Sequence, residues 1–269
     1  MENYIGILAL VLICLLLSSL SKRRTRKRYT YYNYRPRNYY PKHAVLLNNN
    51  KSGEQDIVDD RLNEITSIDR GTPSEHELIS ALLDYGISPK AIFHDLYVKN
   101  GENGFAQIDV AVATKVGIIV FEVKDYSGWI FGKGQQNQWT QVLSHGFKYQ
   151  TTKKYRFYNP VLQNESHINI LKKQSKQMNK IPYYSVIVFY GDCELRDVSF
   201  IPSGTFVAKP YRLREVLDII FENTDAEYTD KHEIMNILKS AVDNGNDSET
   251  QNKHVENIKD MLGKDRIFN

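Results

Sequence analysis

The chain has 269 residues and a formal net charge of +3, with 41% hydrophobic and 25% charged residues. This composition is that of a globular protein with one sizeable domain and additional segments, and it excludes collagen-like and low-complexity chains. Two cysteines exclude a disulfide framework, and the sequence contains no Cys/His zinc spacing, nucleophile elbow or dinucleotide fingerprint.

The first segment along the chain is apolar. Residues 4–20 carry no charge and are mostly Leu, Ile and Val, which is close to the lower length limit of a membrane helix. Basic residues follow this segment instead of preceding it, so an uncleaved anchor is favoured over a cleaved signal peptide. The sequence therefore predicts a single-pass protein of the cell membrane, with its N-terminus outside and its C-terminal body in the cytoplasm.

A basic segment comes next. Residues 22–42 hold nine Lys or Arg and no Asp or Glu, so the rest of the chain carries a formal charge of −6. Six tyrosines are interleaved with these cations. Attraction to anionic lipid headgroups is the favoured interpretation, and a nucleic-acid-binding segment is the alternative.

A helix is predicted to begin after Thr72, with Pro73 at its first position. Glu75 falls near the centre of the apolar face of this helix. Thr72 and Glu75 have the spacing of a capping box, which is the favoured role of Glu75. The alternative is that Glu75 reaches over the sheet to a metal ion, and the two roles are compatible. The apolar face consists of Leu78, Ile79, Leu82 and Leu83.

Two apolar segments of strand length then predict a β-hairpin. Residues 105–113 and 116–123 are rich in β-branched residues, and Gly117 can take the positive φ that a tight turn requires. A loop of two or four residues pairs Ala113 with Ile118, whereas a loop of odd length shifts the register by one residue.

The even register has a chemical consequence. It places Asp109 directly opposite Glu122, and Lys124 points to the same face. Like charges in that position are destabilising, and Mg²⁺ or Mn²⁺ between the carboxylates removes the repulsion. The Lys124 ammonium can then orient water or stabilise a phosphate. A same-face ion pair of little energetic value is the simpler interpretation.

In their order along the chain, these motifs resemble the nuclease-related domain family, NERD, which is placed in the PD-(D/E)xK nuclease superfamily. The resemblance covers about residues 70–190, and one departure is Gly71-Thr72 where the family often has Gly-Glu. The motifs that carry it are Gly71…Glu75, Gln107-Ile108-Asp109, Phe121-Glu122-Val123-Lys124 with Tyr126 and Gly128, Trp139, and Asn159-Pro160…Gln163.

This resemblance implies a site and its chemistry. Asp109 and Glu122 are expected to bind Mg²⁺ (or Mn²⁺), Glu75 to assist as a ligand or water-positioning group, and Lys124 to activate the attacking water. The implied catalytic set is therefore Glu75, Asp109, Glu122 and Lys124, with Gln107 and Gln163 as possible supporting residues.

Two further residues with family counterparts have simpler interpretations. Asn159 is expected to cap the helix that begins at Pro160, and Trp139 is expected to pack in the core instead of stacking on a base.

The implied fold is α/β, with a restriction-endonuclease-like αβββαβ core around a central mixed sheet. One N-terminal transmembrane helix precedes this core and C-terminal helices follow it. The expected divisions are a transmembrane anchor at 1–21, a basic Tyr-rich juxtamembrane linker at 22–69, a nuclease-like domain at 70–223 and a C-terminal helical extension at 224–269.

Residues 145–158 mix lysines and an arginine with aromatic residues. They are interpreted either as a contact to a phosphate backbone or as an ordinary solvated loop.

The expected function is a membrane-anchored cytoplasmic metal-dependent nuclease that hydrolyses phosphodiester bonds of DNA or RNA. Its expected partners are nucleic acid, with DNA first, the membrane through residues 4–20, and anionic lipid through residues 22–42. The alternative is a catalytically inactive nuclease-fold module that binds nucleic acid or a protein at the membrane. The intact charged set argues against this alternative, since a degenerate module would more often have lost Asp109 or Lys124.

Overall fold

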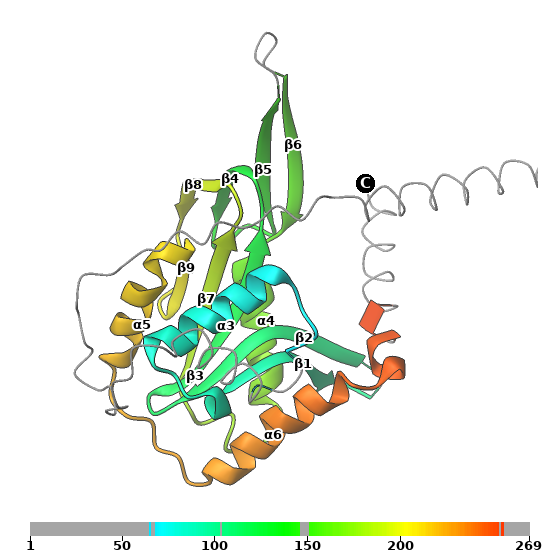
Figure 1. Cartoon of the computed structure of the whole chain (residues 1–269), viewed down its shortest axis with the longest axis vertical. Helices are drawn as coiled ribbons and strands as arrows, with labels where there is room; N and C mark the ends of the chain where they lie inside the picture. The colour runs from blue at the N-terminus through cyan, green and yellow to red at the C-terminus, as the bar shows by residue number, and fades with distance from the viewer. Residues whose placement is uncertain (1–64, 66–67, 103, 146–150, 253, 256–269) are drawn as a thin grey trace, which may run out of the picture. The chain divides into compact units, whose positions relative to one another are not determined.

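The computed structural model describes residues 65, 68–102, 104–145, 151–252 and 254–255. The predicted anchor at 1–21 and nearly all of the predicted linker at 22–69 lie outside these residues. The described residues form two β-sheets with helices packed against them (Figure 1).

A five-stranded mixed sheet forms the centre of the fold. Its first three strands are antiparallel neighbours, whereas the last two are parallel to the third strand and to each other. In spatial order the strands are β1 (Ile92–Asn100), β2 (Gly104–Thr114), β3 (Gly117–Asp125), β7 (Tyr183–Tyr190) and β9 (Thr205–Ala208).

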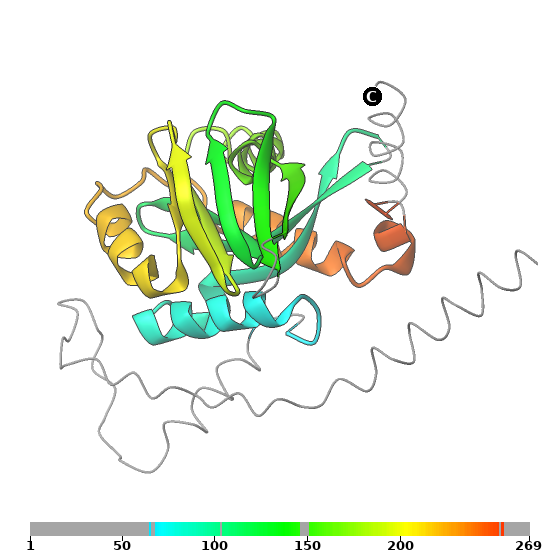
Figure 2. The same cartoon turned by 90° about the horizontal axis from the view of Figure 1, so that it is seen from above.

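Four helices cover this sheet. α3 (Pro73–Tyr85) and α5 (Leu213–Phe221) pack against one face, and α4 (Pro160–Lys172) and α6 (Lys231–Asn244) pack against the other (Figure 2). Both faces of β3 are therefore buried, which explains the almost continuous apolar sequence of that strand. Two short 3₁₀ helices, η1 (Pro89–Ala91) and η2 (Pro210–Arg212), complete the helical elements.

A second, four-stranded sheet extends beyond the end of β3. Its spatial order is β6 (Thr151–Tyr158), β5 (Gln138–His145), β4 (Gly128–Lys133) and β8 (Cys193–Ser199). The β5–β6 hairpin projects from the body of the domain (Figure 1). Trp139 is fully buried and stacks on Phe189, at a ring-centroid distance of 6.1 Å, so the packing role predicted for it is confirmed.

The structure confirms an α/β fold with a mixed sheet. The helix and strands of the expected core occur in the expected order, α3, β1, β2, β3, α4 and β7, and β4–β6 are inserted between β3 and α4. The loop interpretation of residues 145–158 is wrong, because most of that segment is the strand β6.

The hairpin turn follows the even register predicted from the sequence. Ala113 pairs with Ile118 and Thr114 with Gly117, so the loop has two residues. Gly117 has a φ of +136°, and the carbonyl oxygen of Pro182 lies where a Cβ at this position would point.

The localisation predicted from the sequence requires a correction. Among the described residues no helix is long and apolar enough to cross a bilayer, and this finding does not support a single-pass membrane protein. The segment 4–20, on which that prediction depended, lies outside the described residues.

We expect Gly117→Ala to lower the free energy of unfolding by about 3 kcal/mol, because it combines a strained φ with a backbone clash. A Cβ at this position would lie 2.4 Å from the Pro182 carbonyl oxygen. Urea denaturation of the two proteins measures the difference. Gly101→Ala is the matched control, because Gly101 also has a positive φ, +74°, but nothing lies within 4 Å of the point that its Cβ would occupy. We expect a loss of about 1 kcal/mol there, and equal losses at the two glycines would contradict the clash.

Candidate active site

A buried ion pair lies at the end of β3. The Lys124 Nζ is 2.5 Å from the Glu122 Oε1, and the two side chains point to the same face of the strand. Glu122 is only 1% exposed, whereas Lys124 retains partial access to solvent. Lys124 also donates a hydrogen bond to the Gln163 Oε1 on α4, at 3.2 Å. This geometry differs from the exposed, weak ion pair that was the simpler interpretation of the sequence.

Asp109 lies where β2 separates from β3. The register of the two strands would place it opposite Glu122, but the backbone pairing ends one residue earlier, at Val110 and Phe121. The Asp109 Oδ2 instead accepts a hydrogen bond from the Val123 backbone N–H, at 2.7 Å. The carboxylate therefore replaces a backbone acceptor at the point where the sheet opens.

The environment of the site shifts the pKa values of the two carboxyl groups in the same direction. Burial and the nearby Glu122 raise the pKa of Asp109 well above its ordinary value. Burial also raises the pKa of Glu122, and Lys124 only partly offsets this effect. For Lys124, burial acts to lower the pKa, but the attraction of Glu122 and Asp109 raises it overall, so the ammonium stays protonated.

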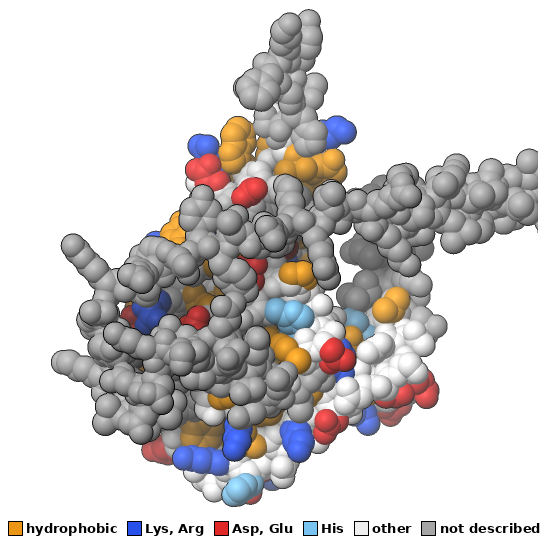
Figure 3. Space-filling view, in the orientation of Figure 1, with side chains coloured by type: hydrophobic (Ala, Val, Ile, Leu, Met, Phe, Trp, Pro, Cys, Tyr) orange, Lys and Arg blue, Asp and Glu red, His pale blue; other side chains and the backbone are white. Residues whose placement is uncertain are grey.

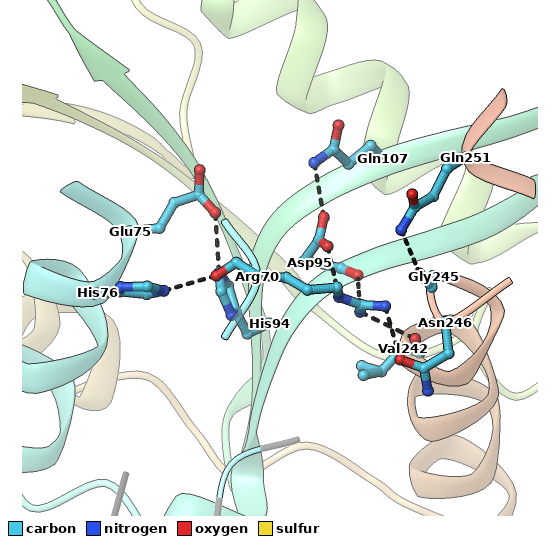
Figure 4. Close-up of polar contacts among 10 residues, drawn as sticks. All are labelled: Arg70, Glu75, His76, His94, Asp95, Gln107, Val242, Gly245, Asn246 and Gln251. Atoms are coloured by element: carbon cyan, nitrogen blue, oxygen red, sulfur yellow. Dashed lines mark hydrogen bonds and ion pairs between the residues drawn. The ribbon is translucent and has the colours of Figure 1, made fainter. Parts of the chain in front are cut away.

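Glu75 enters from the first turn of α3. Thr72 is the N-cap of this helix, and its hydroxyl accepts from the Glu75 backbone N–H and donates to the Glu75 Oε1, at 3.3 Å and 2.8 Å. The other carboxylate oxygen lies 2.9 Å from the Nε2 of the buried His94 (Figure 4). The capping role is thus confirmed.

The charge of Glu75 also reaches the β3 site. Burial acts to raise the pKa of Glu75, but hydrogen bonds from His94 and Thr72 lower it overall, so the carboxylate is ionised. This negative charge raises the pKa of both Asp109 and Glu122. The three predicted carboxylates are therefore electrostatically coupled, although Glu75 is tied to other partners.

The two predicted supporting glutamines have different positions. Gln163 contacts Lys124, whereas Gln107 donates its hydrogen bond to the Asp95 Oδ1, at 2.7 Å (Figure 4). Asp95 has a φ of +52°, and it also forms an ion pair with Arg70, at 2.9 Å. Gln107 therefore belongs to a polar cluster that joins β1, β2 and the segment before α3.

His167 is a site residue that the sequence analysis did not identify. Its Nδ1 lies 3.5 Å from the Glu122 Oε2, four residues along α4 from Gln163. Burial, with Lys124 nearby, lowers the pKa of His167 to about 4, so its ring is neutral near pH 7. Helical spacing from Gln163 is the signal that could have found it, since residues four apart share a helix face.

One oxygen of the ion pair has no hydrogen-bond partner. The Glu122 Oε2 and the His167 Nδ1 are both buried, and neither makes a hydrogen bond within the described structure. An unsatisfied buried carboxylate oxygen is costly, and such oxygens are the ligands that hard divalent cations prefer. Among the described residues, however, no three His, Cys, Asp or Glu side chains are already arranged to hold a metal ion. The donor chemistry fits a divalent cation, and Glu75 is the candidate ligand most engaged with other partners.

Comparison with known proteins points to one family. Residues 70–190 match the family model of the nuclease-related domain, NERD, which belongs to the PD-(D/E)xK-like nuclease superfamily. The chain is 27% identical over 183 residues to an uncharacterized protein of Bacillus anthracis, a match that covers 66% of this chain and 79% of that protein. No solved structure matches the chain significantly.

We expect Asp109→Asn to increase the free energy of unfolding by about 1 kcal/mol at neutral pH in the presence of EDTA, because it removes a partly buried charge that Glu122 and Glu75 repel. The asparagine oxygen can still accept the hydrogen bond from Val123. Urea denaturation measures the effect. Asp225→Asn is the control, since Asp225 is an exposed residue paired with Lys115. Destabilisation by Asp109→Asn under these conditions would show that the carboxylate is not repelled by its neighbours.

Proposed function

We propose, from the match of residues 70–190 to the nuclease-related domain family, that the protein is a metal-dependent nuclease that hydrolyses phosphodiester bonds of nucleic acid. The observation that supports this proposal most strongly is the buried Glu122–Lys124 ion pair beside Asp109. A purely structural role does not explain two coupled carboxylates, a partly buried ammonium and an unsatisfied carboxylate oxygen at the opening of a sheet.

In this proposal Asp109 and Glu122 hold a divalent cation, Mg²⁺ or Mn²⁺, and Glu75 serves as a third ligand or orients a water molecule. Nuclease domains of the PD-(D/E)xK-like superfamily typically use divalent metals. When bound, such a cation lowers the pKa of a water molecule and offsets negative charge on the phosphate.

Lys124 has a separate role. Because Glu122 keeps its ammonium protonated, Lys124 can donate hydrogen bonds to the attacking water and to a phosphate oxygen. Gln163 fixes the position of this ammonium from α4. The water oxygen forms a bond to phosphorus and gives up one proton to the solvent, the bond to the leaving sugar oxygen breaks, and that oxygen takes up one proton from the solvent.

Substitution of Lys124, the cation of the ion pair, tests the proposed nuclease activity. The full chain is incubated with circular DNA, linear DNA and RNA in Mg²⁺ or Mn²⁺, and cleavage rates are compared between the wild type and Lys124→Ala. We expect the wild type to cleave DNA, and Lys124→Ala to lose about 10²-fold or more of the rate, the usual contribution of a positioned proton-transfer or charge-stabilising group. EDTA should abolish cleavage.

The control for this experiment is Lys115→Ala, which removes an exposed lysine from the turn of the same hairpin. It should cleave at the wild-type rate. If the folded wild type cleaves none of the substrates, the competing function, a nuclease-fold module that binds without cleaving, replaces the proposal.

Metal binding is expected to appear as thermal stabilisation. At a Mg²⁺ concentration ten times the Kd, binding to the folded state contributes about 1.4 kcal/mol, which raises the Tm of a domain of this size by roughly 3–5 °C. Glu122→Gln should remove this shift, because it removes the charge of the most buried ligand. Differential scanning fluorimetry with and without Mg²⁺ measures it.

Glu194→Gln is the matched control for this measurement, since Glu194 is an exposed residue of β8 paired with Arg196. It should retain the full shift. A Mg²⁺ shift that persists in Glu122→Gln would show that the cation binds somewhere other than this site.

A further inference from the structure

The hairpin of β5 and β6 carries a cluster of positive charge that the proposed chemistry does not use. We call the described strands of this hairpin, residues 138–145 and 151–158, the basic arm. Lys153, Lys154 and Arg156 lie close together on β6 and are exposed, and neither strand of the arm contains an Asp or a Glu. β6 is also the edge strand of its sheet.

The charge of the basic arm differs from that of its surroundings. At the opposite edge of the same sheet, Arg196 on β8 is paired with Glu194, at 2.9 Å. Within the described structure none of the three cations of the arm forms an ion pair. Outside residues 22–42 the chain has a formal net charge of −6. The unpaired positive cluster therefore has the opposite sign to the net charge of this part of the chain. Such a patch is the electrostatic signature of a polyanionic partner.

Exposed aromatic rings accompany these cations. Tyr155 and Tyr158 are 47% and 54% exposed, and strand alternation places them on opposite faces of β6. Figure 3 shows basic and hydrophobic side chains next to each other where these strands leave the body. Aromatic rings interleaved with cations are the elements that bind nucleic acid, since bases stack on the rings while phosphates pair with the cations.

One face of the basic arm continues toward the candidate active site. Phe157, on the same face as Lys153 and Tyr155, contacts Tyr126 at a ring-centroid distance of 4.7 Å. Tyr126 follows the site strand by one residue, and the charge of Lys124 acts on its phenol. Neighbouring side chains therefore connect the ion pair to the arm.

The same end of β6 is also joined to the site through the chain itself. β6 ends at Tyr158 and α4 begins at Pro160, and α4 carries the Gln163 that contacts Lys124. The fully buried Asn159 fixes this junction, because its Nδ2 donates to the carbonyl oxygens of Gly134 and Gln136 at 2.9 and 2.7 Å. The base of the arm thus has a fixed position relative to the site.

The length of the basic arm suits a strand of nucleic acid. From Phe157 to Lys153 the strand rises by about 13 Å, at about 3.3 Å per residue. At about 3.4 Å per nucleotide along one strand of a duplex, this length corresponds to roughly four nucleotides. Lys153 lies on this face, and Lys154 and Arg156 project from the other face of the same edge strand, so cations flank both sides of the arm over this length.

We propose that the basic arm binds the nucleic-acid substrate beside the scissile phosphate, through phosphate contacts from Lys153, Lys154 and Arg156 and base stacking on Tyr155. This inference rests on the proposed nuclease function for its substrate, but the binding itself is measured without cleavage. Protection of an edge strand from aggregation also uses lysine. Reversal of the charges separates the two roles, because glutamates protect an edge as well as lysines but repel phosphates.

The test is the binding of fluorescent 20-nucleotide probes, single- and double-stranded, DNA and RNA, to the full chain in EDTA, followed by anisotropy over a range of salt concentrations. We expect Lys153→Glu/Lys154→Glu/Arg156→Glu to weaken binding by about 10-fold to 100-fold at 50 mM salt. The slope of log K against log salt should fall by about 2 on single strands and by about 3 on duplexes, because the variant no longer neutralises the phosphates that these cations contact.

Two further variants make the test specific. Lys90→Glu/Lys180→Glu/Lys239→Glu changes the net charge of the chain by the same amount at exposed lysines of other segments, and it should bind nearly as the wild type does. Tyr155→Thr should weaken binding to single strands by about 10-fold and affect duplexes less, because only unpaired bases stack. The milder Lys153→Gln/Lys154→Gln/Arg156→Gln replaces the charge reversal if melting curves show that the latter is unfolded.

The outcomes distinguish this inference from the proposed function. If the arm variant binds with wild-type affinity and salt slope, or if the control triplet is weakened equally, the inference is wrong even when the wild type cleaves DNA. If binding depends on the arm but the wild type cleaves nothing, the inference holds and the proposed nuclease activity is wrong.

Discussion

The candidate site depends on the point where β2 separates from β3. Backbone pairing ends at Val110 and Phe121, and the next donor of β3, the Val123 N–H, is satisfied by the side chain of Asp109. An unpaired backbone donor at this depth would be costly, so the carboxylate supports the opening of the sheet. The same hydrogen bond holds Asp109 beside Glu122. One interaction therefore both ends the strand pairing and positions a candidate ligand.

This charged cluster lowers the free energy of unfolding, and the packing of the rest of the domain offsets the loss. The carboxylates of Asp109 and Glu122 repel each other in a site of low solvent access, and the partly buried ammonium of Lys124 offsets only part of that repulsion. The cost is concentrated at the end of β3, whereas the first part of the strand, with Ile119 and Phe121, is fully buried between α3 and α4. A site that lowers stability is tolerated when a rigid core holds it in place. Here β3 connects the candidate site directly to the apolar core.

The inserted strands add a basic hairpin beside the candidate site. β4, β5 and β6 lie between β3 and α4, the two elements that carry Lys124 and Gln163. The insertion thus begins just after Lys124 and ends just before Gln163, and these two residues contact each other. In such an architecture the core sheet supplies the position of the reacting groups, and the inserted hairpin supplies a surface of different charge beside them. The proposed chemistry and the proposed contacts to a long substrate therefore belong to separate segments of the chain.

Local patterns in the sequence determined much of the fold and the site. The helical spacing of Leu78 to Leu83, the N-cap at Thr72 and the register set by the Gly117 turn all followed from short-range rules, and the structure confirms them. The spacing of Glu122 and Lys124 likewise placed both on one face. Three features were decided only by tertiary structure. β6 is exposed on both faces and has no hydrophobic alternation to reveal it. Gln107 donates its hydrogen bond to Asp95 on the neighbouring strand, a residue with a positive φ, and not to a residue of the candidate site. His167 shares a helix face with Gln163, but its contact with Glu122 depends on how α4 packs against the sheet, and the helical spacing alone does not give that packing.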